Sequence, residues 1–196
     1  MTPPTKNDSL HREPTPPLAR RDLLKRIIGA TIARISTTVR AAKNPRRYPG
    51  RFGGSVCLLE LGSGEILRFG LLDSLGCLSL FLERTSDGTW LDEPPEEDGS
   101  YRELWAGDPD GGDTAIAQFE GSEIEQVEVL VLDRTGEVPY GGKEERAVAL
   151  TCRGRGELLF AVGLHREDGT PDLPAALLPS DVPAALWQRL ERRPII

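Results

Sequence analysis

Histidine and cysteine are scarce in this chain, and their scarcity limits the chemistry that it can support. The 196 residues include two histidines, His11 and His165, and three cysteines, Cys57, Cys77 and Cys152. Histidine is the most common general base and metal ligand near neutral pH. The cysteines have neither Cys-x-x-Cys spacing nor a histidine at ligand spacing, and the sequence has no Gly-x-Ser-x-Gly nucleophile elbow. We therefore expect no catalytic residue, no zinc site and no cofactor. An enzyme, the third class of function, would need a cleft that gathers His165 with a cysteine or two carboxylates.

Long hydrophobic runs and long helical patterns are absent too. No stretch of about 18 uncharged apolar residues occurs, so we expect no membrane-spanning helix. Gly (21) and Pro (16) are together well above their usual share of a globular chain. This frequent punctuation by turns excludes a coiled coil or a bundle of long helices.

Charge is distributed unevenly along the chain. Residues 1–52 carry a net charge of +9, and the remainder carries −16. Such a charge division favours electrostatic association with charged partners. The acidic remainder repels nucleic acid, so we expect no nucleic-acid partner and favour a basic protein partner.

The basic N-terminal region has two predicted parts. Residues 1–19 form a proline-rich tail that cannot bury enough apolar surface to offset its ordering entropy, so we expect it to be disordered. Apolar residues then recur at spacings typical of a helical face. The sequence thus predicts a basic amphipathic helix over residues 20–44, with the apolar face Leu24, Ile27, Ile28, Ile35 and Val39.

A second interpretation of the same region is an export signal. The sequence Arg20-Arg21-Asp22-Leu23-Leu24-Lys25 resembles the twin-arginine signal, in which an arginine pair precedes large apolar residues. The resemblance implies a signal over residues 19–42 and an exported mature chain. Two further interpretations are a helix that docks on its own domain or on a partner, and peripheral membrane contact through residues 20–43.

Residues 52–196 form an acidic domain with mainly two-residue periodicity. We predict about eight short strands, including hairpins at 56–72 and 147–165 and strands at 78–82, 90, 101–105, 114–119 and 124–133. A C-terminal helix begins near Ser180 or Asp181, with Pro183 in its first turn. The expected fold is mainly β, an antiparallel sandwich or a flattened barrel with a helix at each end.

The two hairpins resemble each other. A shift of 92 residues aligns Val56 with Val148 and Gly62-Ser63-Gly64-Glu65 with Gly154-Arg155-Gly156-Glu157, and it gives six identities in thirteen positions. One explanation is an internal duplication. The other is that both hairpins need the same glycine-bearing turn, and that strand composition supplies the remaining matches.

Carboxylates are the most prominent candidate binding groups. Asp108, Asp110 and Asp113 lie within six residues and are weak candidates for a calcium site. Gly112, Asp113 and Phe119 occupy positions where an EF-hand needs other residues, so the main expectation is an acidic turn without metal. The remaining candidates lie in an acidic loop and on a strand. These partner-binding candidates are Glu93, Glu96, Glu97, Asp98, Glu123, Glu125 and Glu128.

These observations favour a non-enzymatic acidic protein that binds a basic partner through a carboxylate-rich β surface, as toxin-neutralising immunity proteins and small accessory proteins do. The odd number of cysteines favours a reducing compartment, so we expect a cytoplasmic location. The alternative function is that of an envelope protein exported through the twin-arginine signal.

Overall fold

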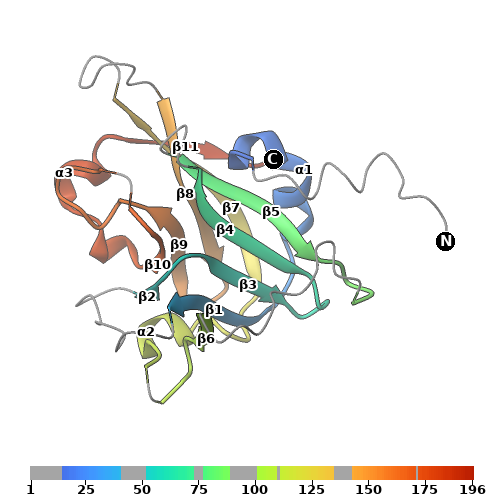
Figure 1. Ribbon diagram of the computed structural model, residues 1–196. Helices are drawn as coiled ribbons and strands as arrows, with labels where there is room; N and C mark the ends of the chain where they lie inside the picture. Colours follow the sequence, from blue (N-terminus) through green and yellow to red (C-terminus); the bar gives the residue numbers. More distant parts are fainter. Residues whose placement is uncertain are drawn as a thin grey trace.

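The computed structural model describes residues 15–40, 52–72, 77–88, 101–109, 111–134, 143–170 and 172–196. The described chain is mainly β, with two antiparallel sheets that do not close into a barrel (Figure 1). Sheet 1 has the order β5-β4-β3-β1-β6 and sheet 2 the order β11-β7-β8-β9-β10-β2. The bounds of sheet 1 are β1 Ile32–Arg40, β3 Cys57–Leu61, β4 Ile66–Leu72, β5 Cys77–Arg84 and β6 Tyr101–Trp105. Those of sheet 2 are β2 Phe52–Gly53, β7 Ile124–Asp133, β8 Lys143–Cys152, β9 Gly156–Val162, β10 Pro174–Leu177 and β11 Leu190–Pro194.

The helices are short and lie at the ends of strands. They are the 3-10 helices η2 (Pro17–Arg20) and η3 (Pro179–Asp181) and the α-helices α1 (Arg21–Arg26), α2 (Thr114–Ala117) and α3 (Ala184–Trp187). Of the tail predicted to be disordered, residues 1–14 lie outside the described residues. Residues 15–19 are ordered, since Thr15 pairs with Leu80 on β5 and η2 follows directly.

The predicted helix over residues 20–44 is wrong beyond its first turns. Only α1 is α-helical, and Ile32–Arg40 forms β1, which pairs with β3 and β6. The register of β1 shifts between Ile32 and Arg34, so Ile32 and Ile35 are both buried in the core. Ile35 and Val39, which the sequence pattern placed on a helical face, lie four residues apart in β1, a spacing that fits one face of a strand as well as one face of a helix.

Two further element predictions need correction. The predicted strand at 114–119 is the helix α2, because Asp113 Oδ1 accepts hydrogen bonds from the backbone of Ala115 and Ile116 (2.9 and 3.3 Å) and caps it. The C-terminal helix is confined to α3, since Leu190 starts β11. The predicted strand at residue 90 lies outside the described residues. Eleven strands are present in the described part of the chain, against about eight predicted.

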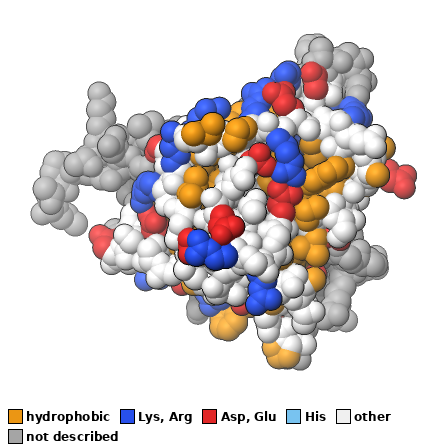
Figure 2. Space-filling view, turned by 180° about the vertical axis from the view of Figure 1, so that it is seen from behind, with side chains coloured by type: hydrophobic (Ala, Val, Ile, Leu, Met, Phe, Trp, Pro, Cys, Tyr) orange, Lys and Arg blue, Asp and Glu red, His pale blue; other side chains and the backbone are white. Residues whose placement is uncertain are grey.

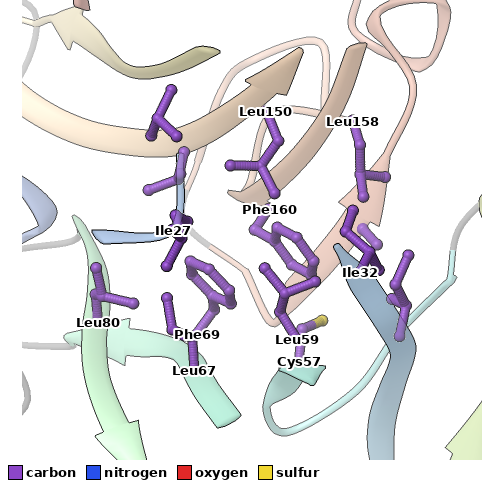
Figure 3. Close-up of a cluster of buried hydrophobic side chains, with 14 of the residues drawn as sticks. Ile27, Ile32, Cys57, Leu59, Leu67, Phe69, Leu80, Leu150, Leu158 and Phe160 are labelled. Atoms are coloured by element: carbon purple, nitrogen blue, oxygen red, sulfur yellow. The ribbon is translucent and has the colours of Figure 1, made fainter. Parts of the chain in front are cut away.

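The main hydrophobic core lies between the two sheets. Phe69 of β4 stacks on Phe160 of β9, with ring centroids 4.2 Å apart and planes 7° apart (Figure 3). Ile27, from the end of α1, is also fully buried in this core. A second apolar layer on the outer face of sheet 2 includes Leu130 and Leu159 and is covered by Leu186 of α3. Both faces of sheet 2 are therefore buried in this region.

The two sheets have the same topology. In residues 15–109, four strands (β1, β3, β4, β5) form a meander, and β6 then returns to pair with β1. In residues 111–196, β7, β8, β9 and β10 form the same meander, and β11 returns to pair with β7. A short helix precedes the first strand of each series. The chain thus consists of two structurally equivalent halves, here called the first half and the second half, and β2 of the first half joins the sheet of the second.

Strand register shows how the halves correspond. Ile35 of β1 pairs with Leu59 of β3, and Val127 of β7 pairs with Leu150 of β8. Equivalent residues of β1 and β7 are therefore 92 positions apart, whereas equivalent residues of the hairpins are 91 positions apart. The bulge at Ile32/Arg34 recurs at Ile124/Gln126. The hairpin alignment by 92 residues is therefore wrong by one position, a slip that exchanges core-facing and outward-facing side chains. The glycine matches in the turns produced it, whereas Phe69 and Phe160 are the true equivalents.

The halves meet through reciprocal backbone hydrogen bonds between residues 29–32 and 121–124, which we call the junction. Gly29 N donates to Ile124 O (2.7 Å), and its equivalent Gly121 N donates to Ile32 O (2.8 Å). Ile32 N donates to Ser122 O and Ile124 N donates to Ala30 O, both at 2.9 Å. Equivalent positions thus make equivalent bonds in both directions, as an approximate two-fold axis requires.

Gly29 and Gly121 offer a test of this equivalence. Their φ angles are +84° and +81°, and a Cβ at either position would meet no atom within 4 Å. Gly29→Ala and Gly121→Ala should each lower the free energy of unfolding by about 1–2 kcal/mol through backbone strain alone. Urea denaturation measures the loss, and Gly→Asn at each site is the control that should cost less. Unequal losses at the two positions would contradict the equivalence.

Candidate functional site

Two of the predicted carboxylates share one arginine. Arg153, in the turn between β8 and β9, donates from Nε to Glu125 (2.7 Å) and from Nη1 and Nη2 to Glu123 (2.8 and 2.9 Å). All three side chains are well exposed. The hydrogen bond to Glu125 and the charge of Glu123 raise the pKa of Arg153, which therefore stays protonated.

A third predicted carboxylate belongs to a neighbouring cluster. Arg192 of β11 contacts Glu128 of β7 and makes a bidentate bond with Glu157 of β9 (2.7 and 2.8 Å). Its guanidinium also lies 5.0 Å from the ring centre of Trp187. Hydrogen bonds to Glu157, and then to Glu128, raise the pKa of Arg192.

Together these groups form what we call the carboxylate surface, defined as Glu123, Glu125, Glu128 and Glu157 with Arg153 and Arg192. Four carboxylates meet two arginines, so the excess charge is negative, and Arg155 in the same turn is also exposed and offsets part of it. Figure 2 shows blue and red side chains lying side by side over one face of the molecule, without one continuous acidic field.

The other predicted acidic candidates are not brought into this surface. Glu93, Glu96, Glu97 and Asp98 lie outside the described residues, as does Asp110. Asp113 is the N-cap of α2, and its side chain is thereby engaged. Among the described residues no group of three His, Cys, Asp or Glu side chains is arranged to hold a metal ion.

The three cysteines, all within the described residues, are buried and form no disulfide. Burial raises the pKa of Cys77 to about 11, and Glu145 and Glu144 act in the same direction. Burial also raises the pKa of Cys152 to about 11. The thiols of Cys77 and Cys152 are protonated at neutral pH, which disfavours a role as nucleophile.

Arg146 is the largest fully buried polar side chain, and sequence reasoning missed it. It is the extra residue of a bulge in β8, between the partners of Leu130 and Val131. Its guanidinium donates to Glu144 (2.8 Å from Nε), Val162 O (3.2 Å) and Gly169 O (2.6 Å). Burial lowers its pKa, and the adjacent Glu144 opposes that shift. The only signal in the sequence was that this arginine follows Glu144 and Glu145 and precedes an apolar run.

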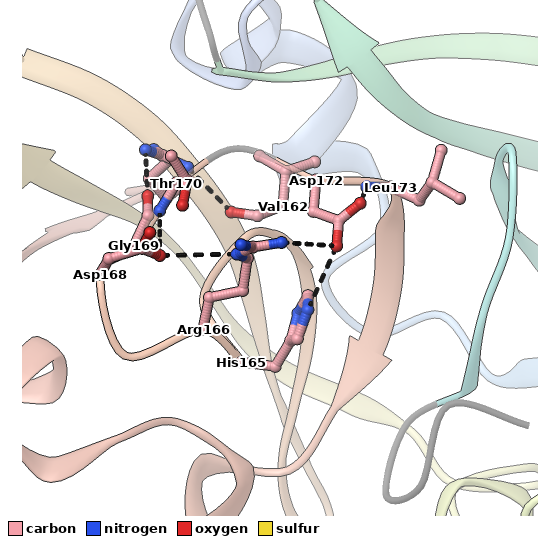
Figure 4. A network of polar contacts seen from close by, with 9 residues as sticks. Val162, His165, Arg166, Asp168, Gly169, Thr170, Asp172 and Leu173 are labelled. Carbon is pink, nitrogen blue, oxygen red and sulfur yellow. Dashed lines mark hydrogen bonds and ion pairs between the residues drawn. The ribbon is translucent and has the colours of Figure 1, made fainter.

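Arg146 fixes the loop that follows β9, which carries His165. Figure 4 shows His165 and Arg166 directed at the carboxylate of Asp172. His165 Nε2 and Arg166 Nη1 lie 3.5 and 3.6 Å from the same oxygen of that carboxylate. Asp168 accepts a hydrogen bond from Thr170 N (3.0 Å), and hydrogen bonds from Thr170 lower the pKa of Asp168 to about 2. His165 thus belongs to a loop network that Arg146 holds through its hydrogen bonds to Val162 O and Gly169 O.

The residues of the predicted export signal are part of the folded structure. Leu23 and Leu24 of α1 are buried in the main core, and Arg20 is 5% exposed. Arg26 forms an ion pair with Glu65, which lies beside the β3–β4 turn. Within the described residues, no helix has the length and apolar content needed to cross a membrane.

Comparisons with known proteins supply no relative from which a role can be inferred. No protein-family model, no curated protein and no solved structure matches the chain. Its function must therefore be argued from its own residues.

The role of Arg146 can be separated from that of the half-exposed Arg166 in the same network. Arg146→Ala should lower the free energy of unfolding by about 3 kcal/mol or more, because Glu144 and two carbonyls lose their buried partner. Arg166→Ala, at a half-exposed ion pair, should cost less than about 1 kcal/mol. Chemical denaturation measures both, and similar small losses would show that the buried contacts contribute little.

Proposed function

We propose that this protein is a non-enzymatic partner-binding protein and that the carboxylate surface receives a basic partner. The observation that carries the proposal is the gathering of Glu123, Glu125, Glu128 and Glu157 around only two arginines. The two arginines hold these carboxylates in fixed positions, so little side-chain entropy is lost when a partner cation replaces or joins them.

The exposure of the groups suggests where the partner makes contact. The side chains of Glu123 and Glu125 are 37% and 43% exposed, whereas those of Glu128 and Glu157 are 13% and 16% exposed under Arg192. A partner arginine or lysine would therefore meet Glu123 and Glu125 first and compete with Arg153. Trp187 beside Arg192 adds an aromatic group of the kind enriched at protein interfaces.

Other features are consistent with this class of function. The buried, protonated thiols of Cys77 and Cys152 do not favour covalent catalysis. Three cysteines outside any disulfide are compatible with the proposed cytoplasmic location.

Affinity measurements with paired variants test the proposal. The full chain is used to capture proteins from its native host at low salt, and the captured protein is then titrated in purified form. We expect a basic partner whose affinity falls with salt and falls roughly tenfold or more in Glu123→Gln/Glu125→Gln. The control is Glu167→Gln, which changes an exposed acid elsewhere. A partner that binds both variants equally, or no retained protein, would refute the carboxylate surface.

Export remains a second hypothesis, and the structure weighs against it on physical grounds. Cleavage near residue 42 would remove β1, which is hydrogen-bonded to both β3 and β6, and with it half of the junction. A chain starting at residue 42 should therefore fail to fold, as measured by loss of the cooperative thermal transition. If that chain folds and the native protein begins near residue 42 outside the membrane, the export hypothesis holds.

A further inference from the structure

The sheet edges differ in how they are protected against pairing with another chain. Exposed edge strands present unpaired backbone groups, and proteins usually shorten them, cover them or place proline on them. At the edge of β5, Leu80 N donates to Thr15 O (2.8 Å), so the chain covers this edge itself. β2 has two residues only. The remaining edges in the described part of the chain are the equivalent strands β6 and β11.

Pro194 protects the edge of β11 against pairing with another chain, whereas β6 has no proline at the equivalent position. Ser36 pairs with Trp105 on β6, and its equivalent Glu128 pairs with Pro194 on β11, so Trp105 and Pro194 occupy equivalent positions. The next residue donates inward in both strands, Ala106 N to Ile35 O (2.9 Å) and Ile195 N to Val127 O (3.0 Å). Since successive amides alternate in direction, the amide at the Trp105 position points away from the sheet. Pro194 eliminates that outward donor, whereas Trp105 and, two residues earlier, Glu103 retain it.

The side chains on the β6 edge are held in place. Arg34 of β1 lies 4.5 Å from the ring centre of Trp105 and forms ion pairs with Glu60 (3.1 Å) and Glu103 (3.5 Å). Trp105 is nevertheless 49% exposed, and the Glu103 side chain 38%. Tryptophan is one of the residue types enriched at the hot spots of interfaces, where a partner buries it fully.

We propose that the outer edge of β6 binds an extended segment of another polypeptide by strand addition, with a basic residue opposite Glu103 and an apolar residue opposite Trp105. The amides of Glu103 and Trp105 donate to the added strand and the carbonyl of Glu103 accepts from it, whereas Trp105 O already accepts from Asp108 N (3.1 Å). The two side chains supply specificity. The site is separate from the carboxylate surface, which lies on sheet 2, and does not depend on it.

Charge complementarity selects this occupant over a second copy of the chain. Antiparallel pairing of β6 with its own copy, centred on Glu103, places two carboxylates opposite each other, which is destabilising. Only alternate residues of β6 direct their backbone groups outward, so the next possible register is shifted by two residues. It places Glu103 opposite Tyr101 or Trp105 of the copy, and neither of these is a cation. A lysine or arginine on a different segment joins Arg34 at the two carboxylates Glu60 and Glu103.

Peptide binding to the full chain tests the proposal. The probe is a capped threonine heptapeptide with lysine and leucine two positions apart, compared with versions carrying glutamate for lysine or proline at the centre. We expect saturable binding of the lysine peptide alone, with slowed amide exchange at Glu103 and Trp105. Trp105→Ala should weaken binding roughly tenfold or more, and Glu103→Lys should transfer the preference to the glutamate peptide.

The control variant is Glu191→Lys on the equivalent strand β11, which should bind the lysine peptide as the wild type does. Because Glu103→Lys exchanges specificity and does not merely lose binding, a folding defect cannot imitate the expected result. The proposal is overturned if no peptide binds, if lysine and glutamate peptides bind alike, or if Glu103 and Trp105 amides are unaffected. Concentration-dependent self-association that protects the same amides and excludes the peptide would overturn it too, because the occupant would then be a second copy.

Discussion

The reciprocal pairing at the junction is the constraint on which the rest of the architecture depends. Each junction segment follows a short helix, turns at a glycine with positive φ and enters the first strand of its half. Each turn has one backbone bond of its own, Ala30 N to Ile27 O and Ser122 N to Phe119 O, and its remaining amides and carbonyls pair with the other half through equivalent bonds. The apolar residues at this turn, Ile27 and Ile32 in the first half and Phe119 and Ile124 in the second, are all buried in the shared core. Hydrogen bonding and burial therefore fix the relative position of the two sheets together.

From this junction the two halves diverge in what they place on their outer faces. Arg68 on β4 is equivalent to Leu159 on β9, and Ser79 on β5 is equivalent to Ala175 on β10. The part of the outer face of sheet 2 around Leu130 and Leu159 is consequently apolar, and the segment with η3 and α3 covers it. The same difference occurs at the edge strands, where Pro194 takes the place of Trp105. A common backbone thus supports one half with a second hydrophobic layer and another with polar side chains on the outside.

Sequence patterning predicted the β-rich class and several strands, because β7 and both hairpins show clear alternation. It failed at β1, where the spacing of four between Ile35 and Val39 fits a strand face as well as a helix face. The apolar residues of the preceding α1 extended the same pattern and favoured a helix. The equivalence of the two hairpins was detectable as a resemblance, but glycine matches in the turns gave a register that places core residues on the outer face. Only the pairing of strands could correct it.

The candidate sites were harder to predict, because the residues that define them are arginines remote in sequence from their partners. Arg192 joins strands β7 and β9 through Glu128 and Glu157, and Arg153 reaches back to the start of β7. The negative charge of the domain is therefore not spread as a free acidic field, since the arginines neutralise part of it locally. Net charge describes long-range attraction to a basic partner, but the contact itself depends on which carboxylates stay exposed after these internal pairs have formed. Glu123, Glu125 and Glu103 meet that condition, and each lies beside an arginine that orders it, so both surfaces offer a partner an acidic group that is already positioned.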